Sequence, residues 1–387
     1  MTDSAALLAD EVLPQKPLRQ WVLSLPFALR FLLATDAEAL TQVLGIVCRT
    51  ISAYVLKKAR LTRTNGATGA VTLIQRFGSA LNLNIHFHML VLDGAYLVGT
   101  ETPVFRRIAP PGEAELQALV ERLAERVGRT LDRRGVLVRD AESSYLELES
   151  AAGGPMADLL GHSITYRVAV GPRAGQKVFS LQTVPAREEE LRKGVAQYAG
   201  FSLHAGIGVE ADQREKLERL ARYVSRPPVS VERVSLTAQG YVRYRLKTPY
   251  RDGTTDIVLE PLDFIARLAA LVPPPRVHLT RYHGVFAGNA ALRAAITPAG
   301  RGSKASSRTP ERATPKHVAL NWARRLKRVF GIEIERCARC GGGLEVIASI
   351  EEPELIERIL AHRRERGEEE AMTVSLGARA PPPVSLL

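Results

Sequence analysis

Two histidines on either side of one phenylalanine, His86 and His88, lie inside the apolar run NIHFHMLVLDG at residues 84–94. Residues i and i+2 of a β-strand share one face, so both imidazoles can approach a single cation. Imidazole suits Zn, Mn, Fe or Ni, and two ligands seldom hold a metal alone. Gln75, on the preceding predicted strand, is favoured as the third ligand, because Asp93 has the opposite strand parity. The alternative is a pair of surface histidines or hydrogen-bonded core histidines.

A tyrosine among cations is the second chemical candidate. In REKLERLARYVSRPPVS (214–230), Tyr223 lies beside the apolar face of a predicted helix, on one stripe with Lys216, Arg219 and Arg226. Residues three, four and seven apart share a helix face. Nearby positive charge favours the phenolate, the form in which tyrosine is a nucleophile. The alternative is a helix-edge tyrosine with its hydroxyl in water.

The elements that must position these groups follow from hydrophobic periodicity. Helical spacing of apolar residues predicts helices over 37–58, 113–134 and 211–225. Runs rich in β-formers predict strands over 71–77, 84–92, 163–170, 201–209, 232–237, 241–247 and 256–261. Because strict βαβ alternation is absent, an α+β fold around a largely antiparallel sheet is expected.

The charge of the chain is concentrated near its carboxyl end. The formal net charge is +12 and the pI about 9.8, which favours a polyanion such as nucleic acid. Residues 301–330 hold nine basic residues against one acid. The Ser/Pro/Arg-rich stretch 301–315 is typical of a linker, and a basic helix with Arg324, Arg325, Lys327 and Arg328 is predicted over 316–331. A solvated linker is the alternative. Trp322 lies on the apolar face of that helix and is expected in a core rather than stacked on a base.

Cysteine use and the amino terminus predict a protein of the reducing cytoplasm. Three cysteines do not make a disulfide framework. Cys337 and Cys340 form the C-A-R-C half of a zinc ribbon, although a remnant or a tight turn is favoured over bound zinc. The acidic start lacks a signal peptide, and the early apolar stretches are too interrupted to span a membrane. We therefore expect no membrane partner.

Four motifs follow one another along the chain: IQRFGSALNLNIHFHMLVLDG (74–94), LERLARYVSRPPVS (217–230), LKTPYRDGTT (246–255) and RYHGVFAGNAALR (281–293). They resemble the rolling-circle insertion-sequence transposases that include the common-region (ISCR) elements. These belong to the HUH endonucleases, named for two histidines around a hydrophobic residue. The resemblance runs from about residue 15 to residue 350.

The resemblance implies an HUH domain with a central antiparallel sheet. In it, His86 and His88 bind Mg²⁺ or Mn²⁺, and Tyr223 attacks single-stranded DNA at an element end to form a 5′-phosphotyrosine. Relatives place a histidine where this sequence has Gln75, which supports Gln75 as third ligand. Some members carry a second tyrosine four residues earlier, where this chain has Arg219, so paired chemistry would need a homodimer. Arg222 joins Lys216, Arg219 and Arg226 as an expected DNA contact.

The expected organisation is a mostly helical part (1–70), an HUH catalytic domain (71–300), a basic linker (301–315) and a carboxyl-terminal part (316–387). Family members commonly begin with a cysteine-rich zinc segment, and none precedes Ala5. Three other functions are alternatives for this chain: a relaxase or replication initiator, a non-catalytic DNA-binding relic, and a two-histidine phosphoesterase. The last would need two H-x-[ST] motifs, and the sequence holds one, at 278–280. The favoured prediction is a bacterial cytoplasmic protein that is nucleoid-associated when bound to DNA and acts on element ends and target DNA.

Overall fold

A computed structural model describes residues 2–99, 102–139, 144–146, 154–184, 194–300, 321–337, 340–345, 350 and 352–365. The chain divides into two compact units, residues 3–317 and residues 318–387. The expected linker, 301–315, lies outside the described residues.

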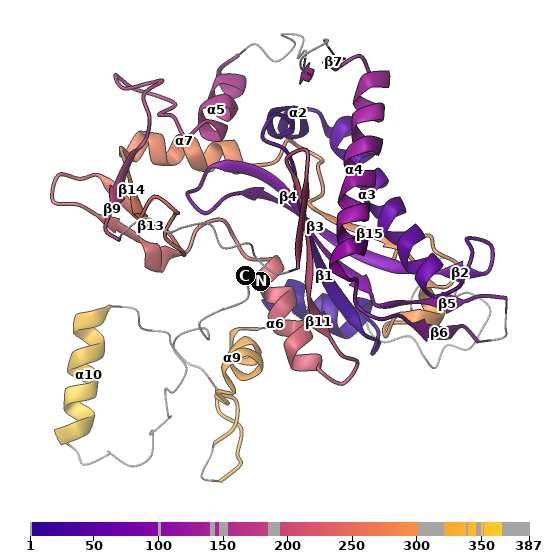
Figure 1. Cartoon of the computed structure of the whole chain (residues 1–387). Helices are drawn as coiled ribbons and strands as arrows, with labels where there is room; N and C mark the ends of the chain where they lie inside the picture. Colours follow the sequence, from indigo (N-terminus) through magenta and orange to yellow (C-terminus); the bar gives the residue numbers. More distant parts are fainter. Residues whose placement is uncertain are drawn as a thin grey trace. The chain divides into compact units, whose positions relative to one another are not determined.

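A six-stranded antiparallel sheet forms the centre of the first unit (Figure 1). The prediction of an α+β fold with an antiparallel sheet is confirmed. In spatial order the strands are β10 (Val195–Tyr198), β11 (Phe201–Val209), β1 (Leu18–Ser24), β4 (Leu83–Leu92), β3 (Gly69–Phe77) and β15 (Thr280–Gly284).

The hairpin of β3 and β4 carries the predicted histidine strand. Gln75 is paired with His86 and Leu73 with His88. The opposite face of β4 is apolar, and Phe87 is fully buried there. The sequence pattern therefore places the polar pair and the packing residue of this strand on opposite faces, as strand parity requires.

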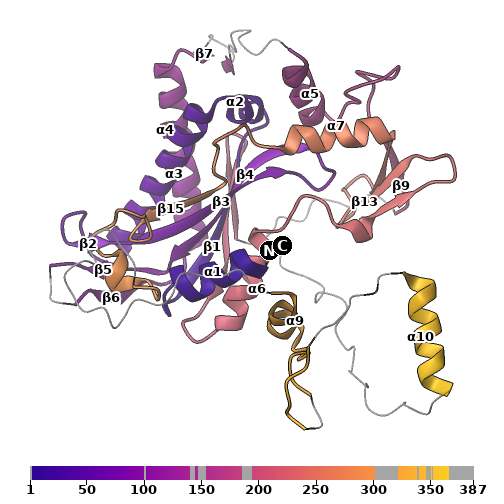
Figure 2. The same cartoon turned by 180° about the vertical axis from the view of Figure 1, so that it is seen from behind.

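Each face of the large sheet is covered by helices that bury an apolar stripe. Three of them share the core of one face: α2 (Leu29–Thr35), α3 (Ala37–Lys58) and α4 (Glu113–Arg133). The other face is covered by α1 (Thr2–Leu7), the π-helical turn η1 (Leu8–Val12) and α6 (Arg214–Val224). Figure 2 shows α1 close to α6, and η1 contacts α6.

The helix α3 begins where the sequence predicts. The carboxylate of Asp36 accepts hydrogen bonds from the backbone N–H groups of Glu38 and Ala39, which caps the helix. By length and hydropathy α3 could span a membrane, but 61% of its most apolar window is buried inside the protein. That burial is typical of the core helix of a globular domain.

A second antiparallel sheet packs around its own small core. Its order is β12 (Val234–Leu236), β13 (Val242–Arg245), β14 (Thr254–Leu259) and β9 (Phe179–Gln182). The remaining elements of the first unit are β2 (Gly66–Ala67), β5 (Gly94–Leu97), β6 (Val104–Arg107), β7 (Leu137–Arg139), β8 (Ser144–Leu146), α5 (Pro155–Ile164), η2 (Val231–Arg233), α7 (Pro261–Leu271) and α8 (Arg293–Ile296).

The strand predicted at 163–170 is wrong. Helix α5 runs through Ile164, and Arg167 makes only an isolated bridge with Lys177. Leu160 and Ile164, one turn apart, are both buried. Burial of this helical pair overrides the β-propensity of the local residues. By contrast, β1 was not predicted, although it lies between β4 and β11.

The second unit contains α9 (Trp322–Phe330) and α10 (Pro353–Glu365). The side chain of Asn321 accepts a hydrogen bond from the backbone N–H of Arg324 and caps α9. The expectation that Trp322 is a core residue is wrong, because 56% of its surface is exposed. Only Ala323 of α9 is buried, so the apolar stripe of this helix has no core within the described residues.

Candidate functional site

Strand pairing brings three predicted ligands to one face of the sheet. Gln75 lies directly across from His86, and His88 follows two residues later on the same face. The ring centroids of His86 and His88 are 5.0 Å apart. This is the cluster that strand parity predicted, built from two neighbouring strands.

Two main-chain carbonyls fix the chemistry of His86 and Gln75. Nδ1 of His86 lies 3.0 Å from the carbonyl oxygen of Asn84. A carbonyl only accepts hydrogen bonds, so Nδ1 carries the proton and Nε2 keeps a free lone pair. Nε2 of Gln75 donates to the carbonyl oxygen of Val224 over 2.8 Å. The amide oxygen Oε1 of Gln75 is thereby turned away from Val224, and it is buried with no hydrogen-bond partner within the described residues.

His88 is held by a residue that sequence reasoning missed. The side-chain amide nitrogen Nε2 of Gln20, on β1, lies 2.8 Å from Nδ1 of His88. Both side chains are almost fully buried, at 1% and 4% exposed. Oε1 of Gln20 has no hydrogen-bond partner among the described residues. An amide has the same shape in its two orientations, and if it is turned so that its oxygen faces the ring, it would accept a hydrogen bond from Nδ1–H of His88. In that orientation Nε2 of His88 would carry no proton.

Burial keeps both imidazoles neutral. Burial, with a smaller contribution from the nearby guanidinium of Arg226, lowers the pKa of His86 to about 4. Burial also lowers the pKa of His88 well below its usual value, with smaller contributions from His86 and Arg226. A neutral imidazole is the form that binds a metal. The orphaned oxygen of Gln75 and the two neutral rings thus fit a divalent cation that accepts nitrogen and oxygen ligands.

Other candidates for the ligand set are occupied or absent. Asp93 forms a bidentate ion pair with Arg19, with both oxygens within 3.0 Å of the guanidinium. In the described ranges no three side chains of His, Cys, Asp or Glu gather as a metal site. The amide oxygen of Gln75 is therefore the third donor that this geometry offers. Two backbone hydrogen bonds join Cys337 to Gly341 and Gly342, the glycines that follow Cys340.

Tyr223 lies beside the histidines. Its ring centroid is 6.1 Å from that of His88. Helix α6 places it there by burying Leu217, Leu220, Ala221 and Val224, the four residues predicted for its apolar face. The aromatic ring itself is half-buried between the sheet and solvent.

Two cations bracket the tyrosine ring. The guanidinium carbon of Arg226 lies 4.5 Å from the ring centroid, and Nζ of Lys247 lies 5.2 Å from it. Helix α6 ends at Val224, so Arg226 approaches from the following loop rather than from the helical stripe. Partial burial and the charges of Arg226 and Arg233 lower the pKa of Lys247. Lys247 was not predicted, although it lies in the motif at 246–255.

The remaining predicted cations of α6 point elsewhere. Arg222 pairs with Glu218 over 3.0 Å. Arg219 lies 3.9 Å from Glu215. Lys216 is partly exposed on the same helix. These residues sit on the surface of the tyrosine helix but do not stack on its ring.

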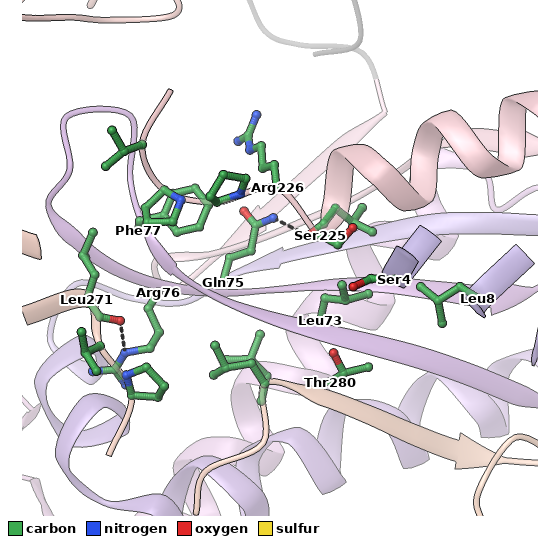
Figure 3. Close-up of a pocket in the computed structure, with 18 of the residues that line it drawn as sticks. Ser4, Leu8, Leu73, Gln75, Arg76, Phe77, Ser225, Arg226, Leu271 and Thr280 are labelled. Carbon is green, nitrogen blue, oxygen red and sulfur yellow. Dashed lines mark hydrogen bonds between the residues drawn. The ribbon is translucent and has the colours of Figure 1, made fainter. Parts of the chain in front are cut away.

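A cavity of about 710 Å³ opens next to Gln75. Figure 3 shows Gln75, Phe77 and Arg226 around it, with the dashed bond from Gln75 to the residue preceding Ser225. Its walls are mostly apolar, and they include Pro227 and Pro228 of the loop after α6. Nε of Arg226 is buried without a hydrogen-bond partner in the described part of the chain. The cavity therefore has the side chains of Gln75 and Arg226 in its wall, while His86, His88 and Tyr223 do not line it.

Residues 69–293 match the model of a family described as "Putative transposase" (Y2_Tnp). This region is more than half of the chain. The protein belongs to this transposase family. No curated protein and no solved structure matches the chain.

The transposase match covers every residue of the candidate site except Gln20. It includes the β3–β4 hairpin, α6 and the motif with Lys247. A transposase acts on DNA, cleaving and rejoining it, which agrees with the cationic surroundings of Tyr223. The second unit, with α9 and the two cysteines, lies outside the matched region.

Proposed function

We propose that this transposase is a metal-dependent HUH enzyme with Tyr223 as its nucleophile, acting in rolling-circle transposition of an insertion sequence. The observation that carries the proposal is the 6.1 Å separation of the Tyr223 and His88 rings. A nucleophile and a set of neutral metal ligands thereby meet at one face of the sheet. The same face also holds the unpaired oxygen of Gln75.

His86, His88 and Gln75 would hold Mg²⁺ or Mn²⁺, which when bound would polarise the scissile phosphate and offset its developing charge. The protein's own contribution is to present three lone pairs. The carbonyl of Asn84 orients His86, the carbonyl of Val224 orients Gln75, and the amide of Gln20 orients His88. Such outer hydrogen bonds set the tautomer and direction of metal ligands.

In the proposed reaction, the phenol of Tyr223 loses its proton to solvent and its oxygen attacks the phosphorus of single-stranded DNA at an element end. The bond from phosphorus to the 3′ oxygen breaks, and that oxygen takes up a proton as a 3′-hydroxyl. The product is a 5′-phosphotyrosine. Arg226 and Lys247 offset the negative charge of the phosphate as the oxygen of Tyr223 attacks it. Attack of a 3′-hydroxyl on the phosphotyrosine reverses the step, so rejoining needs no ATP.

DNA would also be held by charged side chains on each of the two units. Lys216, Arg219 and Arg222 on α6, and Arg324, Arg325, Lys327 and Arg328 on α9, are proposed phosphate contacts. The exposed Trp322 is available to stack on an unpaired base. Because Arg219 occupies the position of a second tyrosine, two simultaneous phosphotyrosines would require a homodimer.

The test is incubation of the protein with end-labelled single-stranded DNA from the element end and Mn²⁺, followed by a denaturing gel. A covalent protein–DNA adduct is expected for the wild type and for Tyr198→Phe, a change at an exposed tyrosine outside the site. Tyr223→Phe should form none. An adduct that survives Tyr223→Phe would overturn the assignment of the nucleophile.

The same gel separates the proposal from a non-catalytic relic. A relic would bind the DNA without any adduct in the wild type. His86→Ala separates chemistry from binding, because it should abolish the adduct and leave DNA affinity nearly unchanged.

A further inference from the structure

A second cavity, of about 500 Å³, lies where α3 passes the end of β15. Its walls come from one side of α3, from Arg63 in the loop after that helix, and from His283 and Gly284 of β15. Helix α3 covers the face of the large sheet opposite to the one that holds α6. This cavity is therefore separate from the Tyr223 site.

The surface at this cavity is crowded with arginines. Arg49 and Arg63 line it. Arg126 lies on the neighbouring α4. Burial is the largest cause of its lowered pKa, and the nearby charges of Arg49, Arg63 and Arg122 lower the pKa further. We call these four residues the α3 basic surface: Arg49, Arg63, Arg122 and Arg126.

These arginines lack acidic partners. Within the described residues none of the four is ion-paired with a carboxylate, and Nη1 of Arg126 donates a hydrogen bond to the hydroxyl of Thr50. Glu125, on the same stretch of α4, is paired with Arg129 instead. Like charges held close together destabilise a fold, and a bound anion relieves their repulsion. The α3 basic surface is therefore suited to bind a polyanion.

We propose that the α3 basic surface binds the phosphate backbone of a DNA segment other than the one at Tyr223. Guanidinium groups bind phosphate oxygens in a bidentate manner, and they track a backbone without reading sequence. The occupant is DNA because the protein is a transposase, and transposition joins an element end to a second DNA segment. The inference does not depend on the tyrosine chemistry.

The test measures the salt dependence of DNA affinity for Arg49→Gln/Arg63→Gln, by fluorescence anisotropy in EDTA. Each lost phosphate contact reduces the slope of log K against log salt by about 0.9 for duplex and about 0.7 for single strands. Two lost contacts make the slope shallower by about 1.8 or about 1.4. Between 50 and 200 mM salt, the ratio of the wild-type to the variant association constant should then fall roughly 12-fold with duplex or roughly 7-fold with single strands. Either result supports the proposal and identifies the form of DNA.

The matched control is Arg107→Gln/Arg173→Gln, which removes the same charge from two surface arginines that are already paired with Glu210 and Glu260. Its slope should equal that of the wild type. Equal slopes for the wild type and Arg49→Gln/Arg63→Gln would overturn the proposal, and so would an equal loss in the control.

A second measurement uses the wild-type chain. Modification of arginine side chains by phenylglyoxal, read by mass spectrometry, should be slowed at Arg49 and Arg63 when DNA is added, while Arg173 reacts unchanged. Full reactivity of both residues in saturating DNA would contradict the proposal. Because EDTA prevents metal-dependent cleavage, failure of the Tyr223 mechanism leaves both measurements interpretable.

Discussion

The substitution Gln20→Leu tests how the metal site is oriented. Gln20 lies on β1 and its amide is the hydrogen-bond partner of Nδ1 of His88. Leucine keeps the approximate volume and removes the acceptor. With Nδ1 unpaired in a buried place, the neutral ring should move its proton to Nε2, the atom that would bind the metal.

The expected cost follows from the loss of one outer hydrogen bond. Such a loss typically weakens metal binding 10- to 100-fold, which corresponds to about 1.4 to 2.8 kcal/mol. Folding stability should also fall, by about 1 to 3 kcal/mol, because removing one partner leaves a buried polar atom of His88 without a hydrogen bond. Gln20→Glu keeps an acceptor and should retain tight binding.

The assay is nitrogen NMR on protein labelled at histidine, without metal or DNA, with His88 assigned through His88→Gln. The proton of His88 should reside on Nδ1 in the wild type and in Gln20→Glu, and on Nε2 in Gln20→Leu. Titration of Mn²⁺ by calorimetry measures the affinity, with Gln42→Leu on the surface of α3 as control. A wild-type His88 protonated on Nε2, or unchanged Mn²⁺ affinity in Gln20→Leu, would refute the reasoning.

Three further predictions concern charge, pH and backbone. Arg226→Gln should slow adduct formation roughly 100-fold, because it removes a cation 4.5 Å from the ring centroid of Tyr223. The loss of DNA affinity should be smaller. Single-turnover gels at several protein concentrations measure both quantities. Because the pKa of His86 is lowered to about 4, the unfolded chain binds a proton that the folded chain excludes between pH 6.5 and about 4. Stability of the metal-free protein is therefore full above pH 6.5 and falls as the pH is lowered through that window, at up to about 1.4 kcal/mol per pH unit; urea denaturation should show a shallower dependence in His86→Gln. Gly284→Ala should destabilise the protein by about 2 kcal/mol or more in the same assay, because Gly284 has a φ of +59° and an added Cβ would lie 1.9 Å from the carbonyl oxygen of Thr68.

Local hydrophobic periodicity was sufficient to predict a helix or strand where one face of the element is buried and the other is exposed. The helices at 37–58, 113–134 and 211–225 and the strands at 71–77 and 84–92 were found within a few residues of α3, α4, α6, β3 and β4. The same reasoning failed at β1. Its polar residues Arg19 and Gln20 are buried, since they bind Asp93 and His88, and their burial hides the alternation of a strand.

The site was predictable where a rule of geometry connects residues near in sequence. Strand parity puts His86 and His88 together, and the hairpin brings Gln75 opposite them. Gln20 and Lys247 reach the site only through the tertiary fold, one from β1 and the other from the loop after β13. The motif at 246–255 carried a signal for Lys247, but its role required knowing where Tyr223 lies.

Gln75 shows how an amide could replace a histidine as a metal ligand. A neutral histidine at this position would donate one N–H and keep one lone pair for a metal. The amide of Gln75 does both, because its Nε2 donates to the carbonyl of Val224 and its Oε1 stays free. Val224 directly follows Tyr223, so this hydrogen bond links the ligand strand to the nucleophile's helix. The proposed metal and nucleophile are thereby held in register by one side chain, and changing it should disturb both metal affinity and the position of Tyr223.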